Sequence, residues 1–261
     1  MKKSIITQSA VLLTIGCVTS SAATIAYTGT NLEAAGSWDG GALPGDEDEG
    51  IISSNSTWGG NLDGFGNPTT VVLTQTAGTA TGTFHLRHGA TYNLEGGTIA
   101  GAGNSNANGS TINLSGGLFQ FAGDIIANGT GAINVSGTAT IATTANEFDL
   151  RINADTAEFN IDPAWTGSFI GLAETTEANW ISELVYGAGP AGAGTSGVVN
   201  TARLMNVGGV DIIDTNFADF FTVTPISGGG SALSLTNPIP EPSSAALLGL
   251  SALVLTGRRR K

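Results

Sequence analysis

The chain of 261 residues is acidic and rich in glycine, with 9 lysine and arginine residues against 21 aspartate and glutamate residues and a formal net charge of −12. Six of the cations lie near the two ends, so the segment from Thr24 to Asn237 carries three arginines against 20 acidic residues, a net charge near −17. Such a segment repels phosphate backbones and offers no basic patch, which argues against a nucleic-acid partner. The 39 glycines and the low charged fraction of 11% favour short strands with tight turns over disorder.

Residues 1–23 have the parts of a secretory signal peptide. Lys2 and Lys3 form a basic end, an apolar stretch runs from Ala10 to Val18, and small residues close the segment. We predict cleavage after Ala23 by the export machinery, with the secretion translocon as the first partner.

A lipoprotein is the alternative interpretation of this segment. Gly16-Cys17 matches the end of a lipobox, but Thr14 stands where that motif has an aliphatic residue. If Cys17, the single cysteine, leaves with the signal peptide, no disulfide can support the mature fold.

Residues 24–69 are expected to form an N-terminal cap and the first strands. Trp38, a Pro44-Gly45 turn, the acidic run Asp46–Glu49 and the apolar pair Ile51-Ile52 follow one another. This order resembles the opening of autotransporter-passenger-like repeat proteins, and the resemblance implies a β-solenoid on an exported protein without catalytic residues. The carboxylates of the acidic run have oxygens suited to Ca²⁺, but they lack the spaced Asp/Asn-Gly pattern of a dedicated site. We interpret the run as a solvated loop and predict no metal site.

A short phrase recurs at intervals of about 20 residues between residues 70 and 162. Its copies are Tyr92-Asn93-Leu94-Glu95-Gly96, Ile112-Asn113-Leu114-Ser115-Gly116 and Ile133-Asn134-Val135-Ser136-Gly137, and Phe159-Asn160-Ile161 is a weaker fourth copy. A repeat this short cannot bury its own apolar face, so stacked coils are expected to share one continuous core.

Stacking predicts which side chains point inward. The first and third residues of each phrase form two inward columns, the asparagines between them point outward, and Gly96, Gly116 and Gly137 occupy the corners. A second apolar pair, Phe84/Leu86 or Ile125/Ala127, precedes the first and third copies.

The predicted fold class is all-β. We expect a right-handed parallel β-helix (solenoid) with capping segments, flanked by an N-terminal signal helix and a C-terminal transmembrane helix. A β-sandwich is the alternative, although a sandwich has less reason to repeat one phrase at a fixed offset.

After Asp162 the pattern changes, and residues 163–236 are expected to form a C-terminal cap over the open end of the coils. The expected elements are a helix over 175–185 with Thr175 as N-cap and Glu177 in its first turn, a loop over 186–200, and strands, or a turn of helix between strands, at 210–223 and 232–235.

The end of the chain combines a Pro-rich linker at 237–242 with an apolar helix and a basic end at 243–261. Residues 243–257 carry no charge, and Arg258, Arg259, Arg260 and Lys261 follow. A 15-residue helix is about 22 Å long, which is marginal for a hydrocarbon core of about 30 Å. The four cations are expected to stay on the cytoplasmic side of the membrane.

The motif Pro240, Glu241 and Pro242, the apolar helix and the basic end together resemble the PEP-CTERM protein-sorting signal of Gram-negative bacteria. The resemblance implies export through the inner membrane, transient anchorage by the C-terminal helix, recognition by an exosortase-like membrane protease, and a final place at the cell surface or outside the cell. The alternative is an ordinary buried C-terminal helix, but such a helix alternates apolar with polar positions.

The sequence holds no recognisable catalytic constellation. His85 and His88 stand three apart in a predicted strand and therefore lie on opposite faces, which disfavours a shared metal. Asp149, Arg151 and Glu158 form a trio with the chemistry of polysaccharide-cleaving enzymes, but charge pairing at a strand edge explains them equally well. We predict no catalytic residues, no cofactor and no enzymatic activity.

Two functions remain as expectations. The first is an exported, non-enzymatic cell-surface or extracellular-matrix protein, associated with exopolysaccharide, biofilm or the envelope. The alternative is a carbohydrate-binding or polysaccharide-degrading β-helix protein. A sugar site needs aromatic platforms beside convergent carboxylates, and the scattering of Trp38, Trp58, Trp165 and Trp180 favours the first function.

Overall fold

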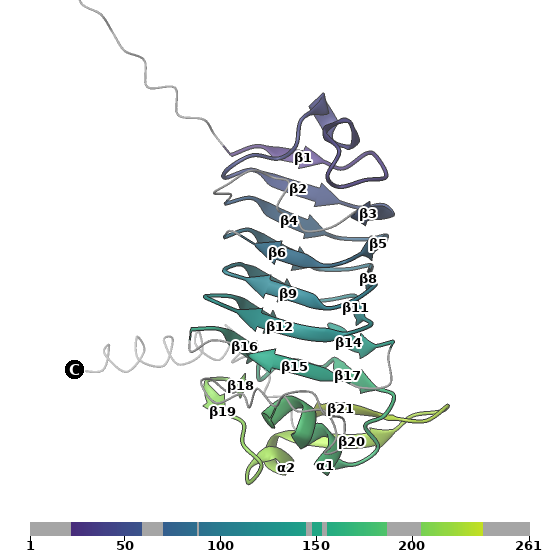
Figure 1. Cartoon of the computed structure of the whole chain (residues 1–261), viewed down its shortest axis with the longest axis vertical. Coiled ribbons are helices and arrows are strands. Elements are labelled where there is room, and N and C mark those ends of the chain that lie inside the picture. Colours follow the sequence, from purple (N-terminus) through teal and green to yellow (C-terminus); the bar gives the residue numbers. More distant parts are fainter. Residues whose placement is uncertain are drawn as a thin grey trace, which may run out of the picture.

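The computed structural model shows a stack of β-strand coils with a mixed segment of helices and antiparallel strands at one end (Figure 1). It describes residues 22–58, 70–87, 89–144, 148–152, 156–186 and 205–236. Outside these residues lie residues 1–21 of the predicted signal peptide, His88, residues 187–200 of the predicted 186–200 loop, and the sorting tail from residue 237 on. The predicted β-solenoid is confirmed, and the β-sandwich is wrong, because strands of successive coils pair in parallel.

Three sheets form the sides of the solenoid. The nine-stranded sheet has the order β1 (Thr24–Ala26), β2 (Glu49–Ile52), β4 (Val72–Gln75), β7 (Thr91–Leu94), β10 (Thr111–Leu114), β13 (Ala132–Val135), β16 (Glu158–Ile161), β18 (Asn206–Val207) and β19 (Val210–Asp211). The eight-stranded sheet has the order β20 (Phe221–Pro225), β21 (Ser231–Leu235), β17 (Ser168–Gly171), β14 (Thr140–Thr143), β11 (Leu118–Phe121), β8 (Thr98–Gly101), β5 (Thr79–Gly82) and β3 (Ser56–Trp58). The four-stranded sheet has the order β15 (Asp149–Ile152), β12 (Asp124–Asn128), β9 (Ser105–Asn108) and β6 (His85–Arg87).

The predicted register of the repeated phrase is confirmed. Tyr92 pairs with Ile112, which in turn pairs with Ile133, and Ile133 pairs with Phe159. These side chains are buried, as are those of the second column, Leu94, Leu114, Val135 and Ile161. Each coil therefore buries its inward side chains against those of the neighbouring coils.

Aromatic rings pack along the interior of the stack. Centroid distances are 4.6 Å for Trp58–Phe84, 5.7 Å for Phe84–Phe119 and 5.2 Å for Phe121–Phe148, all near edge-to-face geometry, which aromatic pairs favour. All four tryptophans are at most 4% exposed. None of them provides a surface platform for a sugar ring.

The corners of the coils differ from the prediction by one residue in two copies. Gly97 and Gly117, rather than Gly96 and Gly116, have positive φ angles of 78° and 72°, whereas Gly137 has one of 56° as predicted. The first two copies end in a pair of glycines, and the second of the pair takes the left-handed conformation.

The strand before the second copy of the repeated phrase, β9, has no large apolar residue that could have marked it in the sequence. β9 places Ser105 and Ala107 in the inward positions that Phe84 and Leu86 occupy one coil earlier. Because small and hydroxyl-bearing residues fill those positions, the apolar pair seen before the other copies is missing from the sequence here.

The N-terminal coil is closed by two 3₁₀ turns, Ala35–Ser37 and Asp39–Gly41, on either side of Trp38. The Trp38 indole is buried, donates from Nε1 to the Leu32 carbonyl at 2.9 Å, and packs edge-on against Tyr27 at 5.2 Å. This residue anchors the lead-in segment to the stack.

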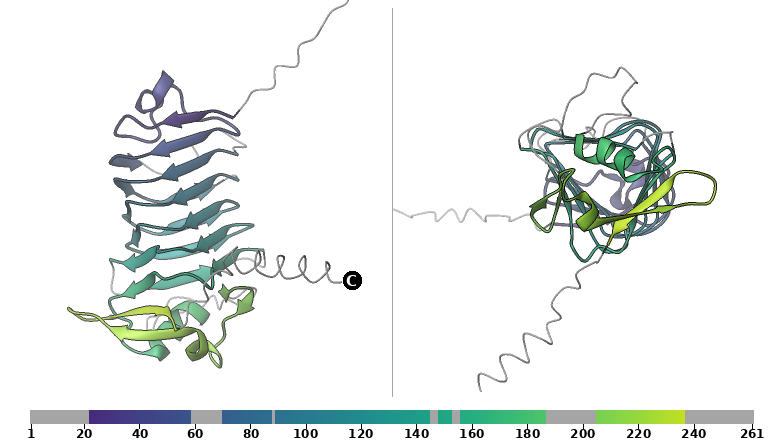
Figure 2. Two further views of the ribbon diagram at one scale, coloured as in Figure 1. Left: turned by 180° about the vertical axis from the view of Figure 1, so that it is seen from behind. Right: turned by 90° about the horizontal axis from the view of Figure 1, so that it is seen from below.

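At the opposite end, α1 (Glu177–Ile181), a π-helical turn at Ser182–Tyr186 and α2 (Phe217–Phe220) accompany the antiparallel β20–β21 hairpin. Seen end-on, helix and hairpin lie across the coils (Figure 2). The N-cap of α1 is Thr176, whose hydroxyl accepts from the Asn179 N–H at 3.3 Å, and not Thr175 as predicted. The extended backbone required of an N-cap falls on Thr176.

Candidate functional site

The carboxylates of the acidic run hold the first coils together. Asp48 accepts hydrogen bonds from the N–H groups of Ala23 at 2.9 Å and Gly45 at 2.8 Å, and these two bonds lower its pKa. Asp46 accepts from the Thr70 N–H, and Glu49 accepts from the Thr74 hydroxyl. Within the described residues, no three His, Cys, Asp or Glu side chains form a group that could hold a metal ion. Asp46, Asp48 and Glu49 thus act as hydrogen-bond acceptors within the first coils.

Ala23, the predicted last residue of the signal peptide, lies within the first coil. Its N–H bonds to Asp48, and its carbonyl accepts from the Glu49 N–H at 2.9 Å. Cleavage after Ala23 removes both bonds and leaves Thr24 as the first residue of β1. The cleavage position stays a prediction.

The predicted trio of Asp149, Arg151 and Glu158 is not brought together. Glu158 lies on β16 in the nine-stranded sheet, where its Oε2 accepts from Asn160 at 3.2 Å. The second carboxylate beside Arg151 comes from Asp124 instead, because β12 and β15 are neighbours in the four-stranded sheet and Asp124 stands in register with Asp149. We call Asp124, Asp149 and Arg151 the Arg151 cluster.

The guanidinium of the Arg151 cluster bridges the two carboxylates. Arg151 Nη2 and Nε lie 2.8 and 3.0 Å from Asp149 Oδ2, and Nη1 lies 3.3 Å from Asp124 Oδ2. Asn104 Nδ2 also donates to Asp124 Oδ2, at 3.2 Å. Like charges opposite each other on neighbouring strands are destabilising, and the shared cation offsets this repulsion.

Burial and the neighbouring Asp149 carboxylate raise the pKa of Asp124, and Arg151 opposes them. The hydrogen bond to Asp149 is the main reason that the pKa of Arg151 is raised. Asp149 Oδ1 is buried without a hydrogen-bond partner among the described residues. Because Arg151 engages a carboxylate oxygen of each aspartate, the arrangement fits an ion cluster between coils better than a general acid and base.

The outward asparagines form a continuous ladder on the nine-stranded sheet. Nδ2 of Asn113, Asn134 and Asn160 donates to Oδ1 of the asparagine one coil before, at 2.8, 2.8 and 2.9 Å. Asn206 extends the ladder by donating to Asn160, and Asn93 begins it by donating to the Thr74 hydroxyl at 3.2 Å. The repeat predicted that these residues point outward but did not predict the ladder. The asparagine at the same position of each copy was the sequence feature that could have indicated it.

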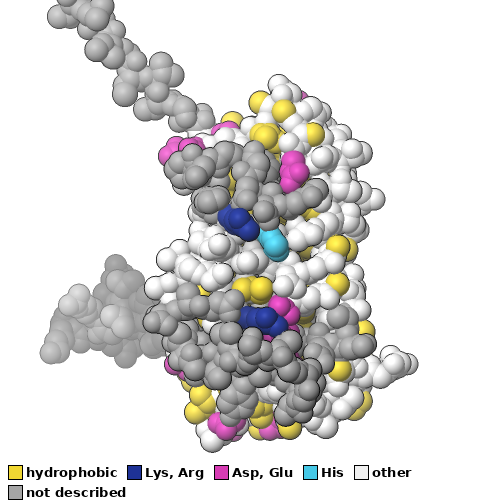
Figure 3. Space-filling model, viewed as in Figure 1, with side chains coloured by type: hydrophobic (Ala, Val, Ile, Leu, Met, Phe, Trp, Pro, Cys, Tyr) yellow, Lys and Arg dark blue, Asp and Glu magenta, His cyan; other side chains and the backbone are white. Residues whose placement is uncertain are grey.

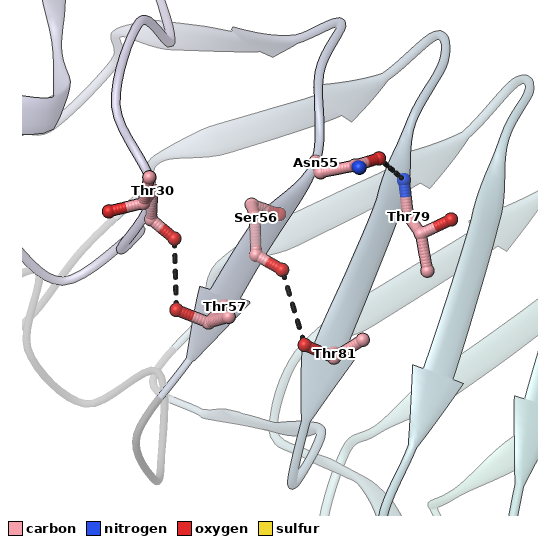
Figure 4. A pocket seen from close by; sticks show the side chains of 6 residues that line it. All are labelled: Thr30, Asn55, Ser56, Thr57, Thr79 and Thr81. Carbon is pink, nitrogen blue, oxygen red and sulfur yellow. Dashed lines mark hydrogen bonds between the residues drawn. The ribbon is translucent and has the colours of Figure 1, made fainter.

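A hollow of about 350 Å³ crosses the first coils next to β3 and β5, and hydroxyl and amide side chains line it (Figure 4). Its lining is Thr30, Asn55, Ser56, Thr57, Thr79 and Thr81, which we call the threonine groove. Thr57 Oγ1 donates to the Thr30 carbonyl at 2.9 Å, and Asn55 Oδ1 accepts from the Thr79 N–H at 2.9 Å. No motif marks this groove in the sequence, because its residues come from three separate segments.

Charged side chains are sparse on the face shown in Figure 3, where uncharged polar side chains and backbone cover most of the described surface. His85 lies on this solenoid in β6 and is partly exposed. The described part of this face therefore presents few charged side chains that could steer a charged ligand.

Comparison with protein families identifies the end of the chain. Residues 238–261 match the PEP-CTERM protein-sorting motif. The chain carries a PEP-CTERM sorting signal. The match begins one residue after the start of the predicted linker at 237 and ends with the basic end at Lys261. No curated protein and no solved structure gave a match.

A PEP-CTERM motif implies an exported, membrane-processed protein that is recognised by an exosortase, a membrane protease. The predicted motif residues Pro240, Glu241 and Pro242 and the basic residues Arg258 to Lys261 fall within the match, outside the described residues. Among the residues that the structure describes, no helix is long and apolar enough to cross a membrane.

Proposed function

We propose that this chain is a non-enzymatic cell-surface or extracellular-matrix protein, delivered by its PEP-CTERM motif, whose solenoid associates with exopolysaccharide in the envelope or biofilm. The motif at residues 238–261 is the observation that carries the proposal. The C-terminal helix anchors the exported chain transiently, and the exosortase removes it.

The build of the solenoid supports a structural role. Its tryptophans are buried, its acidic run accepts internal hydrogen bonds, and the Arg151 cluster pairs its own charges. These tryptophans and charged groups contact other parts of the solenoid, which supports the non-enzymatic proposal.

Substitution of Leu250 by Asp tests the sorting role of the tail. A carboxylate near the middle of the apolar helix costs about 3 kcal/mol in membrane insertion, so the variant should be lost from the membrane fraction and reach the surface in smaller amounts. Leu250→Val is the matched control and should fractionate like the natural chain. Unchanged fractionation of Leu250→Asp would show that the segment has no membrane role.

A carbohydrate-binding role is the second candidate, and the uncharged threonine groove favours it. Threonine hydroxyls can donate to and accept from sugar hydroxyls, and their methyl groups can contact the apolar faces of a sugar ring. If the groove is a saccharide site, Thr81→Val should weaken co-sedimentation with host exopolysaccharide, whereas Thr140→Val, on the same sheet but outside the groove, should not. Equal binding by the two variants would show that the threonine groove is not the saccharide site. Release of new reducing ends from the polysaccharide would contradict the non-enzymatic proposal.

A further inference from the structure

An apolar pocket of about 360 Å³ lies where the chain leaves the folded part of the molecule. Its lining includes Pro163, Val207, Val210, Phe220 and Leu235, with Asp219 as the charged member. These residues come from the turn after β16, the β18–β19 hairpin, α2 and β21. We call this the base pocket.

Part of the base pocket is open to solvent although its lining is apolar. Val210 is 48% exposed and is among the few exposed large hydrophobic residues of the described chain, together with Leu172 and Ile213. Val207 and Leu235, at 4% and 8% exposure, form the buried part of the lining. An apolar pocket with an exposed rim of this kind is suited to a short apolar segment.

The next segment of the chain starts at the pocket. Leu235 is the last residue of β21, and Thr236 N donates to the Phe220 carbonyl at 2.8 Å, so the exit point is fixed against the lining. The sequence continues Asn237-Pro238-Ile239-Pro240. Ile239 is four residues beyond Leu235, which allows a reach of up to about 14 Å in an extended chain.

The chemistry of this segment complements the pocket. Proline-rich segments are preformed in an extended conformation and dock into apolar and aromatic grooves at a low entropic cost. Proline also lacks an N–H group, so burying Pro238 and Pro240 leaves no backbone donor unpaired. Asp219 disfavours an acidic occupant, which selects the neutral residues 238–240 and keeps Glu241 outside.

We propose that the base pocket binds the chain's own linker, with Ile239 inserted beside Val210 and Phe220. The docked linker holds the sorting motif against the C-terminal end of the solenoid. A protease that takes an extended substrate must then draw the linker out of the pocket before it can act. This consequence rests on the sorting role of the tail, whereas the docking itself does not.

Thiol protection tests the docking on the purified full-length chain in detergent. The chain has one native cysteine, Cys17, so Ile239→Cys in a Cys17→Ser background supplies a single thiol. Its alkylation rate is compared with that of a synthetic peptide of residues 236–242 carrying the same cysteine. We expect alkylation in the folded chain to be about tenfold slower, which corresponds to about 1.4 kcal/mol of docking free energy.

Two rim substitutions separate the pocket from other sources of protection. Val210→Asp should bring the alkylation rate close to that of the peptide, whereas Leu172→Asp, at a residue of similar exposure (45%) outside the pocket, should leave the protection intact. The proposal would be overturned if the Ile239→Cys chain with an unaltered base pocket were alkylated at the rate of the peptide. Protection that survives Val210→Asp would also overturn it, by assigning the effect to the detergent.

A disulfide provides a measurement that does not depend on the folding of Val210→Asp. The pair Val210→Cys and Ile239→Cys should form an intramolecular disulfide under mild oxidation, at least about tenfold faster than the pair Leu172→Cys and Ile239→Cys, because docking raises the local concentration of the thiols. Equal rates for the two pairs would overturn the proposal. Because no exosortase takes part, failure here is distinct from failure of the proposed sorting function.

Discussion

At the residue scale, amide side chains tie the coils together from outside. Each asparagine of the ladder donates to one residue of the preceding coil, and Asn93, Asn113, Asn134 and Asn160 also accept from the next coil. Hydrogen bonds arranged in such a chain polarise one another, so the ladder stabilises the register of the strands from β4 to β18. A single substitution interrupts it at two bonds.

Asn113→Ala should therefore lower the free energy of unfolding by about 1–2 kcal/mol, the net value of two side-chain hydrogen bonds. Urea titration measures the loss. Thr111→Ala, on the same strand and also outward-facing, should lose less, because no ladder bond passes through it. Equal losses for the two variants would show that the ladder does not stabilise the fold.

The Arg151 cluster gives stability a pH dependence of known sign. Burial, and to a lesser extent Asp149, raise the pKa of Asp124 in the folded chain above its unfolded value of about 3.9. The folded state then binds the proton more tightly, so stability should increase as pH falls from neutral through the folded pKa, and level off near the unfolded value. Asp124→Asn should flatten this part of the profile in unfolding titrations between about pH 7 and pH 4.

Asp48 provides the opposite sign in a different window. In the chain that retains Ala23, the N–H groups of Ala23 and Gly45 lower its pKa. Its contribution to stability is therefore present above about pH 3.9 and is lost as pH falls through the folded pKa. Asp48→Asn should leave the slope between neutral pH and pH 4 unchanged and weaken the acid transition below it. A slope that persists in Asp124→Asn and vanishes in Asp48→Asn would reverse the two assignments.

At the element scale, each coil depends on a glycine corner. A Cβ on Gly117 would lie 2.6 Å from the Gly97 carbonyl oxygen and 2.9 Å from the Gly96 carbonyl carbon, and the φ of Gly117 is already positive at 72°. Both the backbone conformation and the spacing between coils exclude a larger residue.

Gly117→Ala should lower the free energy of unfolding by about 2 kcal/mol or more, through left-handed strain and backbone displacement. Gly36→Ala is the matched control, because a Cβ there meets nothing within 4 Å, and its effect should stay within about 0.5 kcal/mol. Thermal or urea unfolding compares the two. Similar losses would contradict the account of the corners.

The same elements show how far sequence reasoning reaches. Large apolar residues at a fixed offset predicted the inward columns, since Tyr92, Ile112 and Ile133 meet only if the coils stack. The strand through Ser105 and Ala107 escaped notice because small residues carry no apolar pattern. The predicted trio included Glu158 instead of Asp124 for another reason. Contacts between coils join residues one repeat apart, whereas the predicted trio joined residues close in sequence.

At the scale of the whole molecule, a rigid polar solenoid is joined to a sorting signal. The order of the Pro-rich motif, the apolar segment and the basic end predicts the tail, because these features are local in sequence, and the family match covers residues 238–261. The threonine groove and the base pocket gave no such signal, because each gathers residues from separate segments. Surfaces assembled across coils become visible only once the coils are stacked.

Delivery and processing by the tail can be tested by measuring the mass of the chain recovered from the cell surface of an exosortase-containing host, with and without its exosortase. We expect the surface form to lack Arg258 to Lys261, and we expect loss of the exosortase to leave the full tail on a membrane-bound chain. A surface or secreted form that retains Arg258 to Lys261 in the presence of the exosortase would show that the exosortase does not process the tail.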